Sequence, residues 1–152
     1  MKYTVSLDID LPRERVVALF DDHQNYKRWM TGLRSIERLP DGKHKLTFLF
    51  GRREMVLVET IARRELPELV EAVYQGPDNR NGTVHRFAVI DAGRTRWEQT
   101  TEFQFDGLFM KLQSAVLPGM FRKQTLTYMK CFKDFAESQS DEGFERTQFE
   151  AR

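Results

Sequence analysis

Residues 44–59, with the sequence HKLTFLFGRREMVLVE, decide the fold of this chain because they specify a β-hairpin and its register. Apolar and polar side chains alternate on both sides of Gly51-Arg52, as they do in strands that bury one face. Glycine suits the first position of a two-residue type II′ turn. That turn sets three facing pairs on one side of the hairpin: Phe48 with Met55, Leu46 with Leu57, and His44 with Glu59.

Residues 83–101 predict a second hairpin by the same reasoning. A three-residue loop, Asp91-Ala92-Gly93, joins its strands, with Gly93 in the left-handed conformation. Arg86 then faces Glu98 on the exposed side, whereas a slip of one residue would set Phe87 against Glu98. The inward pairs in this register are Phe87 with Trp97, His85 with Gln99, and Thr83 with Thr101.

Outward from these hairpins, short apolar segments alternate with turn signals. Residues 2–10 alternate strictly and predict a half-buried first strand. Pro12 then begins a helix, and a second short helical stretch covers about Asn25–Met30. Strands joined by tight turns form an antiparallel meander, so seven strands are expected in total. The six strands of the meander are expected at residues 33–39, 43–50, 53–63, 69–75, 83–90 and 94–105.

The last predicted element is a helix from about Leu108 to Glu137. One apolar stripe at helical spacing runs along its first part, and a second stripe runs along its later part on a different side. Pro118-Gly119 lies between the stripes, so we expect a kink or two separate helices there. The domain is thus expected to span residues 1–137, followed by a polar tail at residues 138–152.

The composition is that of one ordinary globular domain. The chain has 152 residues, 40% hydrophobic and 31% charged, with a formal net charge of +1 and a single cysteine, Cys131. This charge balance gives no long-range attraction to nucleic acid. The sequence shows no signal-peptide pattern and no apolar run near the roughly 18 residues of a membrane span. We therefore expect a soluble, cytoplasmic monomer or weak homodimer with no nucleic-acid partner and no cofactor.

The order of these elements is similar to the helix-grip fold. The stretches that carry the likeness are Ile9-Asp10-Leu11-Pro12-Arg13-Glu14-Arg15-Val16, residues 22–33 with Trp29, and Gly93-Arg94-Thr95-Arg96-Trp97. With them, about residues 2–137 resemble the START-like (SRPBCC) superfamily, most closely its bacterial polyketide-cyclase-type members. The resemblance implies an α+β domain whose seven-stranded curved antiparallel sheet wraps around a long C-terminal helix, with two short helices after the first strand. It also implies a deep cavity between sheet and helix that binds lipids, polyketides or other hydrophobic molecules.

The hairpin registers place apolar and polar side chains together on the inner face of this sheet. Phenylalanine has no polar group, so the 12 phenylalanines must be buried or must line an apolar space. Inward polar groups need partners, water or a ligand, and apolar walls with few polar groups are typical of small-molecule sites. We predict that the following residues contact a ligand: Trp29, Leu46, Phe48, Met55, Leu57, Tyr74, His85, Phe87, Trp97, Gln99, Thr101, Phe121, Thr125, Tyr128 and Phe132.

The three histidines are the candidates for chemistry. His44 opposite Glu59 is a candidate acid–base pair, although a salt bridge at the cavity rim is the interpretation we favour. His85 is a second candidate acid or base, although a hydrogen-bonding role in ligand binding is favoured. His23 is expected to face solvent. Because the histidines are far apart in sequence and the chain has one cysteine, no metal site is predicted.

Three functions remain open at this point. The first is a carrier or sensor that binds a small lipid, polyketide or aromatic-like molecule in the cavity. The second is a cyclase- or dehydratase-type enzyme, in which His85 or the His44–Glu59 pair moves a proton and the cavity shapes the substrate. The third is a protein-interaction module similar to chaperone-activator relatives, whose cavity is filled by its own side chains.

Overall fold

Seven antiparallel strands form one sheet in the computed structural model, which describes residues 1–77, 79–105 and 118–139. The strand order is β1-β7-β6-β5-β4-β3-β2, so each strand of the meander neighbours the next and the first strand lies beside the last. This is the expected topology. The strands are β1 (Lys2–Ile9), β2 (Leu33–Arg38), β3 (His44–Phe50), β4 (Arg53–Glu65), β5 (Leu69–Gln75), β6 (Asn79–Asp91) and β7 (Arg94–Phe105).

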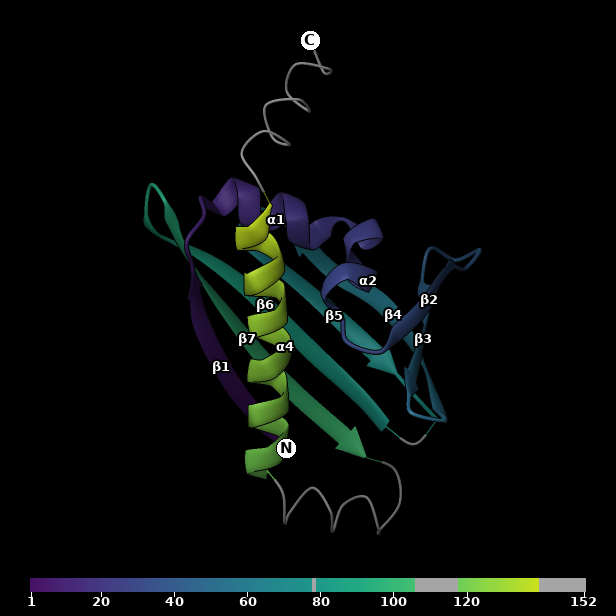
Figure 1. The fold of residues 1–152 in the computed structure, drawn as a ribbon. Helices are drawn as coiled ribbons and strands as arrows, with labels where there is room; N and C mark the ends of the chain where they lie inside the picture. Colours follow the sequence, from purple (N-terminus) through teal and green to yellow (C-terminus); the bar gives the residue numbers. More distant parts are fainter. Residues whose placement is uncertain (78, 106–117, 140–152) are drawn as a thin grey trace.

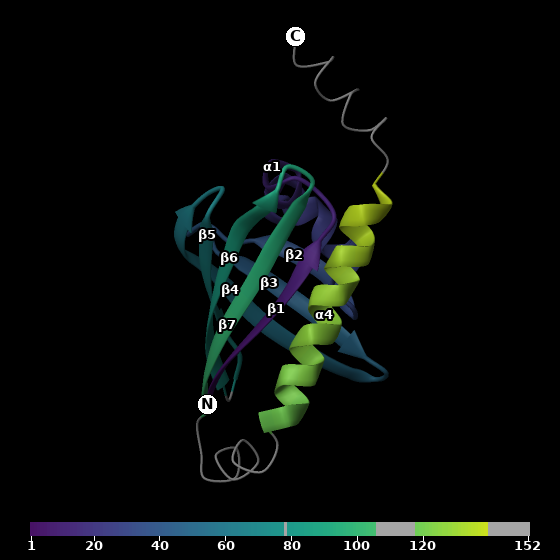
Figure 2. The same ribbon diagram turned by 90° about the vertical axis from the view of Figure 1, so that its left-hand side faces the viewer.

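The long helix α4 lies across one face of the sheet, and the short helices gather at one end of it (Figure 1). Figure 2 shows the same arrangement from the side, with α4 running along the open side of the curved sheet. The chain therefore has the helix-grip fold that the resemblance implies. The helices are α1 (Arg13–Asp21), the 3-10 helix η1 (His23–Asn25), α2 (Tyr26–Trp29) and α4 (Pro118–Ser138).

Both predicted hairpin registers are confirmed. In the first, Phe48 pairs with Met55, and the turn glycine Gly51 has a φ of 64°. A positive φ at this position is what a type II′ turn requires. In the second hairpin, Phe87 pairs with Trp97, and the exposed pair of Arg86 with Glu98 forms as predicted. The register fixes which side chains of β3, β4, β6 and β7 share the inner face.

Two details of the second hairpin differ from the prediction. Gly93 is not left-handed, because the Asp91 carboxylate accepts its N–H at 2.9 Å and a bulge near Val89 adjusts the strand instead. Strand β6 also begins at Asn79 rather than at residue 83. Asn79 pairs with Phe105, and this continuous pairing with β7 outweighs the turn preference of the asparagines and Gly82.

An aromatic core forms where α1, α4 and the sheet meet. Phe132 of α4 and Trp97 of β7 are almost completely buried, and their ring centroids lie 5.2 Å apart at a steep angle. Phe20 of α1 lies 5.6 Å from each of these rings, also edge-on. Edge-to-face contacts of this kind stabilise a core beyond the burial of apolar area. The three elements are thereby held together at this end of the sheet.

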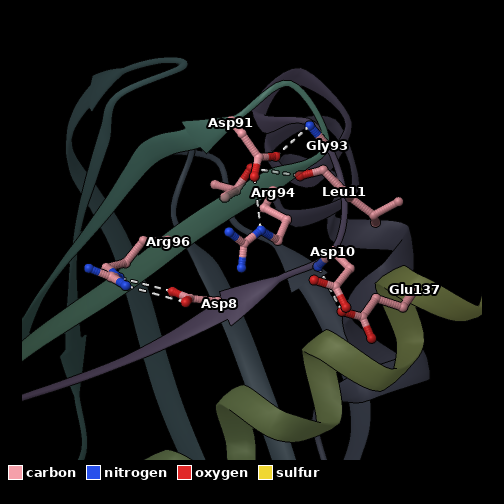
Figure 3. A network of polar contacts seen from close by, with 9 residues as sticks. Asp8, Asp10, Leu11, Asp91, Gly93, Arg94, Arg96 and Glu137 are labelled. Carbon is pink, nitrogen blue, oxygen red and sulfur yellow. Dashed lines mark hydrogen bonds and ion pairs between the residues drawn. The ribbon is translucent and has the colours of Figure 1, made fainter.

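A polar network fastens the C-terminal part of α4 to the end of β1 (Figure 3). The Glu137 carboxylate accepts the backbone N–H of Asp10 at 2.8 Å. Lys133 donates to the Asp8 carbonyl at 2.7 Å and to Glu137 at 2.6 Å. The network adds to the aromatic core and fixes the helix over the β1–β7 edge, which sets the space left between α4 and the remaining strands.

Helix α4 begins at Pro118, where proline is tolerated because a first-turn N–H has no helical partner. The first apolar stripe, and with it the predicted kink, lies outside the described residues, as does the tail from residue 140. Within the helix, Phe132 and Phe135 are buried, as the second stripe predicts. None of the helices in the described ranges is long and apolar enough to span a bilayer.

Candidate functional site

A cavity of about 380 Å³ lies between the sheet and α4, and hydrogen-bonding side chains form one of its walls. On β6 and β7, Thr83 and Thr101 are hydrogen-bonded to each other at 3.3 Å, and Gln99 donates to Thr101 at 3.2 Å. Across the gap, the Tyr3 hydroxyl and Thr125 of α4 are 2.7 Å apart. These groups bond to one another, and each retains donor or acceptor capacity for a ligand.

The opposite wall is apolar and comes from the first hairpin. Leu46 and Phe48 of β3 and Met55 and Leu57 of β4 all line the cavity. They share one face because the register pairs Leu46 with Leu57 and Phe48 with Met55. Met30, at the end of α2, extends this wall. The cavity is therefore two-sided, with aliphatic and aromatic groups facing hydroxyls and amides.

No lysine, arginine, aspartate or glutamate is among the described residues that line the cavity. The ionisable groups in its wall are neutral at physiological pH. Burial raises the pKa of Tyr3, and burial together with the nearby Glu59 raises the pKa of Tyr74. A charged ligand group placed here would lose its hydration without gaining a counterion, which is costly. The walls therefore favour uncharged ligands.

Most residues predicted to bind a ligand do line the cavity. Three do not: Phe87, Trp97 and Phe132. Their exposures are 2%, 1% and 0%, and they pack against Phe20 of α1 in the aromatic core. The twelve that line the cavity are Trp29, Leu46, Phe48, Met55, Leu57, Tyr74, His85, Gln99, Thr101, Phe121, Thr125 and Tyr128.

The sequence prediction missed several wall residues. Thr83 and Tyr3 were on the inward face of predicted strands, so the alternation already contained the signal for them. Asn79 and Asn81 were assigned to a turn, and their place in β6 follows only from the long pairing with β7. The wall residues that were not predicted are Tyr3, Phe20, Tyr26, Met30, Asn79, Asn81, Thr83, Phe103 and Gln124.

His85 is a buried, neutral imidazole in the cavity wall. Its Nδ1 accepts a hydrogen bond from the Trp97 indole N–H at 3.2 Å, so the ring carries its hydrogen on Nε2. The Phe20 ring lies 4.8 Å away. Burial lowers the pKa of His85 to about 3. A histidine that stays neutral and has one nitrogen engaged is suited to donating a hydrogen bond rather than to acting as a general base.

We expect His85 to make the protein less stable as the pH falls below about 6.5, the ordinary pKa of histidine. Between that pH and the folded-state pKa of about 3, the unfolded chain binds a proton that the folded chain does not. The free energy of unfolding therefore decreases by about 1.4 kcal/mol per pH unit, or about 2 kcal/mol at pH 5. Urea unfolding of the wild type and His85→Gln at pH 7 and pH 5 measures the difference. An equal loss in both proteins would contradict the assignment.

Behind the cavity wall, the Glu59 carboxylate of β4 is completely buried. Its Oε1 is 2.9 Å from His23 Nε2 and 4.0 Å from His44 Nδ1. Its Oε2 accepts a hydrogen bond from the Tyr26 hydroxyl at 3.4 Å, and Tyr74 lies near enough that Glu59 adds to burial in raising the pKa of its hydroxyl. Burial lowers the pKa of His44, and the neighbouring His23 lowers it to a smaller extent. The carboxylate is thus surrounded by two imidazoles and two phenols.

Two predictions about this cluster are wrong. His23 does not simply face solvent: it is partly buried, its ring stacks on that of His44 with centroids 3.9 Å apart, and its Nε2 points at Glu59. The Asp22 side chain accepts the Gln24 N–H at 2.9 Å and caps η1, which turns His23 toward the sheet. The predicted pairing of His44 with Glu59 does form in the strand register, with His44 Nδ1 4.0 Å from Glu59 Oε1, but it does not lie at the cavity rim, because neither residue is among the described residues that line the cavity. Glu59 is 0% exposed, and its closer partner is His23.

A second hollow, of about 580 Å³, lies on the outside between α2 and α4. Lys27, Arg28 and Asp134 line it together with Cys131, which is half-buried. Trp29 and Met30 separate this groove from the cavity, because both residues line both spaces. The groove carries charged side chains, so the cavity between the sheet and α4, with its larger apolar wall, is the better candidate for binding an apolar molecule.

Similarity to known proteins agrees with the fold. The family described as polyketide cyclase/dehydrase and lipid transport matches residues 1–131. Among solved structures, a conserved protein from Geobacillus kaustophilus has a TM-score of 0.79 at 14% identity, covering 90% of this chain and 95% of that one. No curated protein is similar enough to the chain to count as a match.

Two further solved structures carry functional or superfamily names. The Zhui aromatase/cyclase from a Streptomyces species has a TM-score of 0.76 at 13% identity, covering 90% of this chain and 93% of its own. A START superfamily protein from Mycobacterium smegmatis has a TM-score of 0.71 at 12% identity, covering 91% of this chain and 99% of that one. At these identities the likeness establishes a shared fold.

Proposed function

Because the chain belongs to the polyketide cyclase/dehydrase and lipid transport family, we propose that it binds a small, uncharged hydrophobic molecule in the cavity, as a carrier or sensor. The ligand lies with its apolar face on the β3–β4 wall and its polar groups along β6, β7 and α4. Lipids, polyketides and aromatic compounds that carry hydroxyl or carbonyl groups have this chemistry. A volume of about 380 Å³ is in the ordinary range for a small-molecule site.

The observation that carries this proposal is the two-sided, uncharged wall. Thr83, Thr101 and Gln99 offer hydroxyls and an amide, and Leu57 and Met55 offer only apolar surface. A ligand gains from burying its apolar part, at about 25 cal/mol per Å², and from pairing its polar atoms with neutral groups. A carboxylate or an ammonium group would lose more hydration here and would meet no opposite charge among the described lining residues.

The acid–base candidates give less support to an enzyme. His85 reaches the cavity, but its low pKa keeps it from accepting a proton near neutral pH. His44 and Glu59 are not among the residues that line the cavity, because Tyr26 and Tyr74 stand in the wall on that side. Proton transfer requires hydrogen-bond reach to the substrate, directly or through one water. Binding is therefore the function that the geometry favours.

A protein-interaction role with a filled interior also receives less support. The described side chains leave the cavity hollow, whereas an interior without a ligand site is normally close-packed. A ligand that fills the space would bury the apolar surface of the β3–β4 wall.

Titration with matched ligand pairs tests the proposal. The two members of a pair share one carbon skeleton, which is flat aromatic, sterol-like or straight-chain. One member ends in an alcohol and the other in a carboxylate. By isothermal calorimetry at pH 7, we expect at least one alcohol to bind, and to bind at least about tenfold more tightly than its carboxylate because the anion would be buried unpaired. The proposal fails if no alcohol binds, or if the carboxylates bind as tightly as the alcohols.

A further inference from the structure

We propose that His23, His44 and Glu59 together bind one divalent transition-metal ion, of which Zn²⁺ is the convenient probe. One donor atom from each residue lies within 4.8 Å of the other two. The three residues come from three different elements, η1, β3 and β4, which the fold brings together behind the cavity wall. The inference concerns this cluster alone and does not depend on which molecule fills the cavity.

The donor set suits zinc and related ions. Imidazole nitrogen and carboxylate oxygen are ordinary zinc ligands, and two histidines with one glutamate leave a fourth position for water. Donor atoms around a tetrahedral zinc lie about 3.3 Å apart, given bonds of about 2.0–2.1 Å. The separations from Glu59 Oε1, 2.9 Å to His23 and 4.0 Å to His44, are close to that value on either side. The two ring nitrogens lie within 4.8 Å of each other, and the stacked rings would have to turn out of their stack to direct both nitrogens at the ion.

The charge at this position also favours a cation. Glu59 is fully buried, and within the described ranges its only ion-pair partners are the two histidines. A buried carboxylate needs positive charge close to it. His44 Nδ1, at 4.0 Å, lies beyond hydrogen-bond distance of the carboxylate. A divalent ion would contact all three groups at once.

Neighbouring groups hold the carboxylate in place. The Tyr26 hydroxyl donates to Glu59 Oε2, which leaves Oε1 directed at the two imidazoles. Outer hydrogen bonds of this kind orient metal ligands and raise metal affinity. The His23 and His44 side chains are 29% and 17% exposed, so an ion and its water can enter from solvent. The cluster thus has donors, orientation and access.

The test is a titration of the full chain, freed of metal by dialysis against a chelator, with Zn²⁺ followed by isothermal calorimetry. We expect one ion per chain, and a loss of affinity of at least about tenfold in His23→Ala, in His44→Ala and in Glu59→Gln. Cys131→Ala is the control, because it removes the one thiol in the chain and should leave the affinity unchanged. Circular dichroism confirms that each variant is folded.

A measurement on the wild type avoids variants altogether. Zn²⁺ should shift the ring-nitrogen NMR signals of His23 and His44 and leave those of the buried His85 unchanged. Absence of stoichiometric binding would overturn the proposal. So would binding that survives loss of either histidine, binding that requires Cys131, or shifts confined to one of the two rings.

Discussion

Replacing Phe132 with alanine is expected to lower the free energy of unfolding by about 3–5 kcal/mol, the range for deleting a large aromatic side chain from a packed core. Phe132 is 0% exposed, and its ring contacts those of Phe20, Trp29 and Trp97 at centroid distances between 5.1 and 5.6 Å. The neighbouring rings belong to three different elements, α1, α2 and β7, and cannot all close in on the space left behind. Urea unfolding at pH 7 measures the change.

Phe121 provides the matched control because it lies on the same helix but lines the cavity. Its side chain is half-buried and packs against Phe103 with ring centroids 5.2 Å apart. Phe121→Ala removes less buried surface and should cost about 1–2 kcal/mol. If the two variants lose equal stability, the division between a packed core around Phe132 and a hollow beside Phe121 is wrong.

Replacing Gln99 with glutamate is expected to weaken binding of an uncharged ligand at least about 100-fold at pH 7. The substitution keeps the size of the side chain but places a carboxylate in a wall that has no charged group among its described residues. Ligand binding would then remove water from an unpaired charge, and a cost of about 3 kcal/mol corresponds to a factor above 100. Calorimetric titration with the tightest-binding alcohol measures the effect.

Gln104→Glu is the control for this prediction. Gln104 lies on the same strand, β7, but is exposed and faces away from the cavity, so the same chemical change should leave affinity unaltered. In Gln99→Glu, burial should raise the pKa of the new carboxyl, so affinity should partly recover as the pH is lowered from 7 to 5. A similar loss in both variants, or no loss in either, would show that the ligand binds elsewhere.

Much of the fold can be predicted from local patterns. The glycine at Gly51 fixes a turn, the turn fixes a register, and the register puts Leu46 and Leu57 on the inner face together. The same reasoning places His85 opposite Gln99. Each step depends only on residues that are close in sequence, which is why strand alternation and turn chemistry suffice. The apolar wall and part of the polar wall follow directly.

The rest depends on contacts between distant parts of the chain. The sequence does not show that η1 turns His23 onto His44, because this position depends on how the short helices pack on the sheet. Nor can alternation distinguish the packed end of the inner face, at Phe87 and Trp97, from its hollow end, at Gln99 and Thr101. Both ends have the same pattern, and only the covering by α1 separates them.

The central claim is that the ligand binds in the cavity between the sheet and α4. The most direct test is methionine methyl NMR during titration with the alcohol and carboxylate pairs. Met55 lines the cavity, whereas Met129 is fully buried in the core and Met120 is exposed on α4. We predict that a bound alcohol shifts the Met55 signal, together with that of Met30, and leaves Met129 and Met120 unchanged. A shift at Met30 without Met55 would place the ligand in the groove between α2 and α4, and would contradict the account.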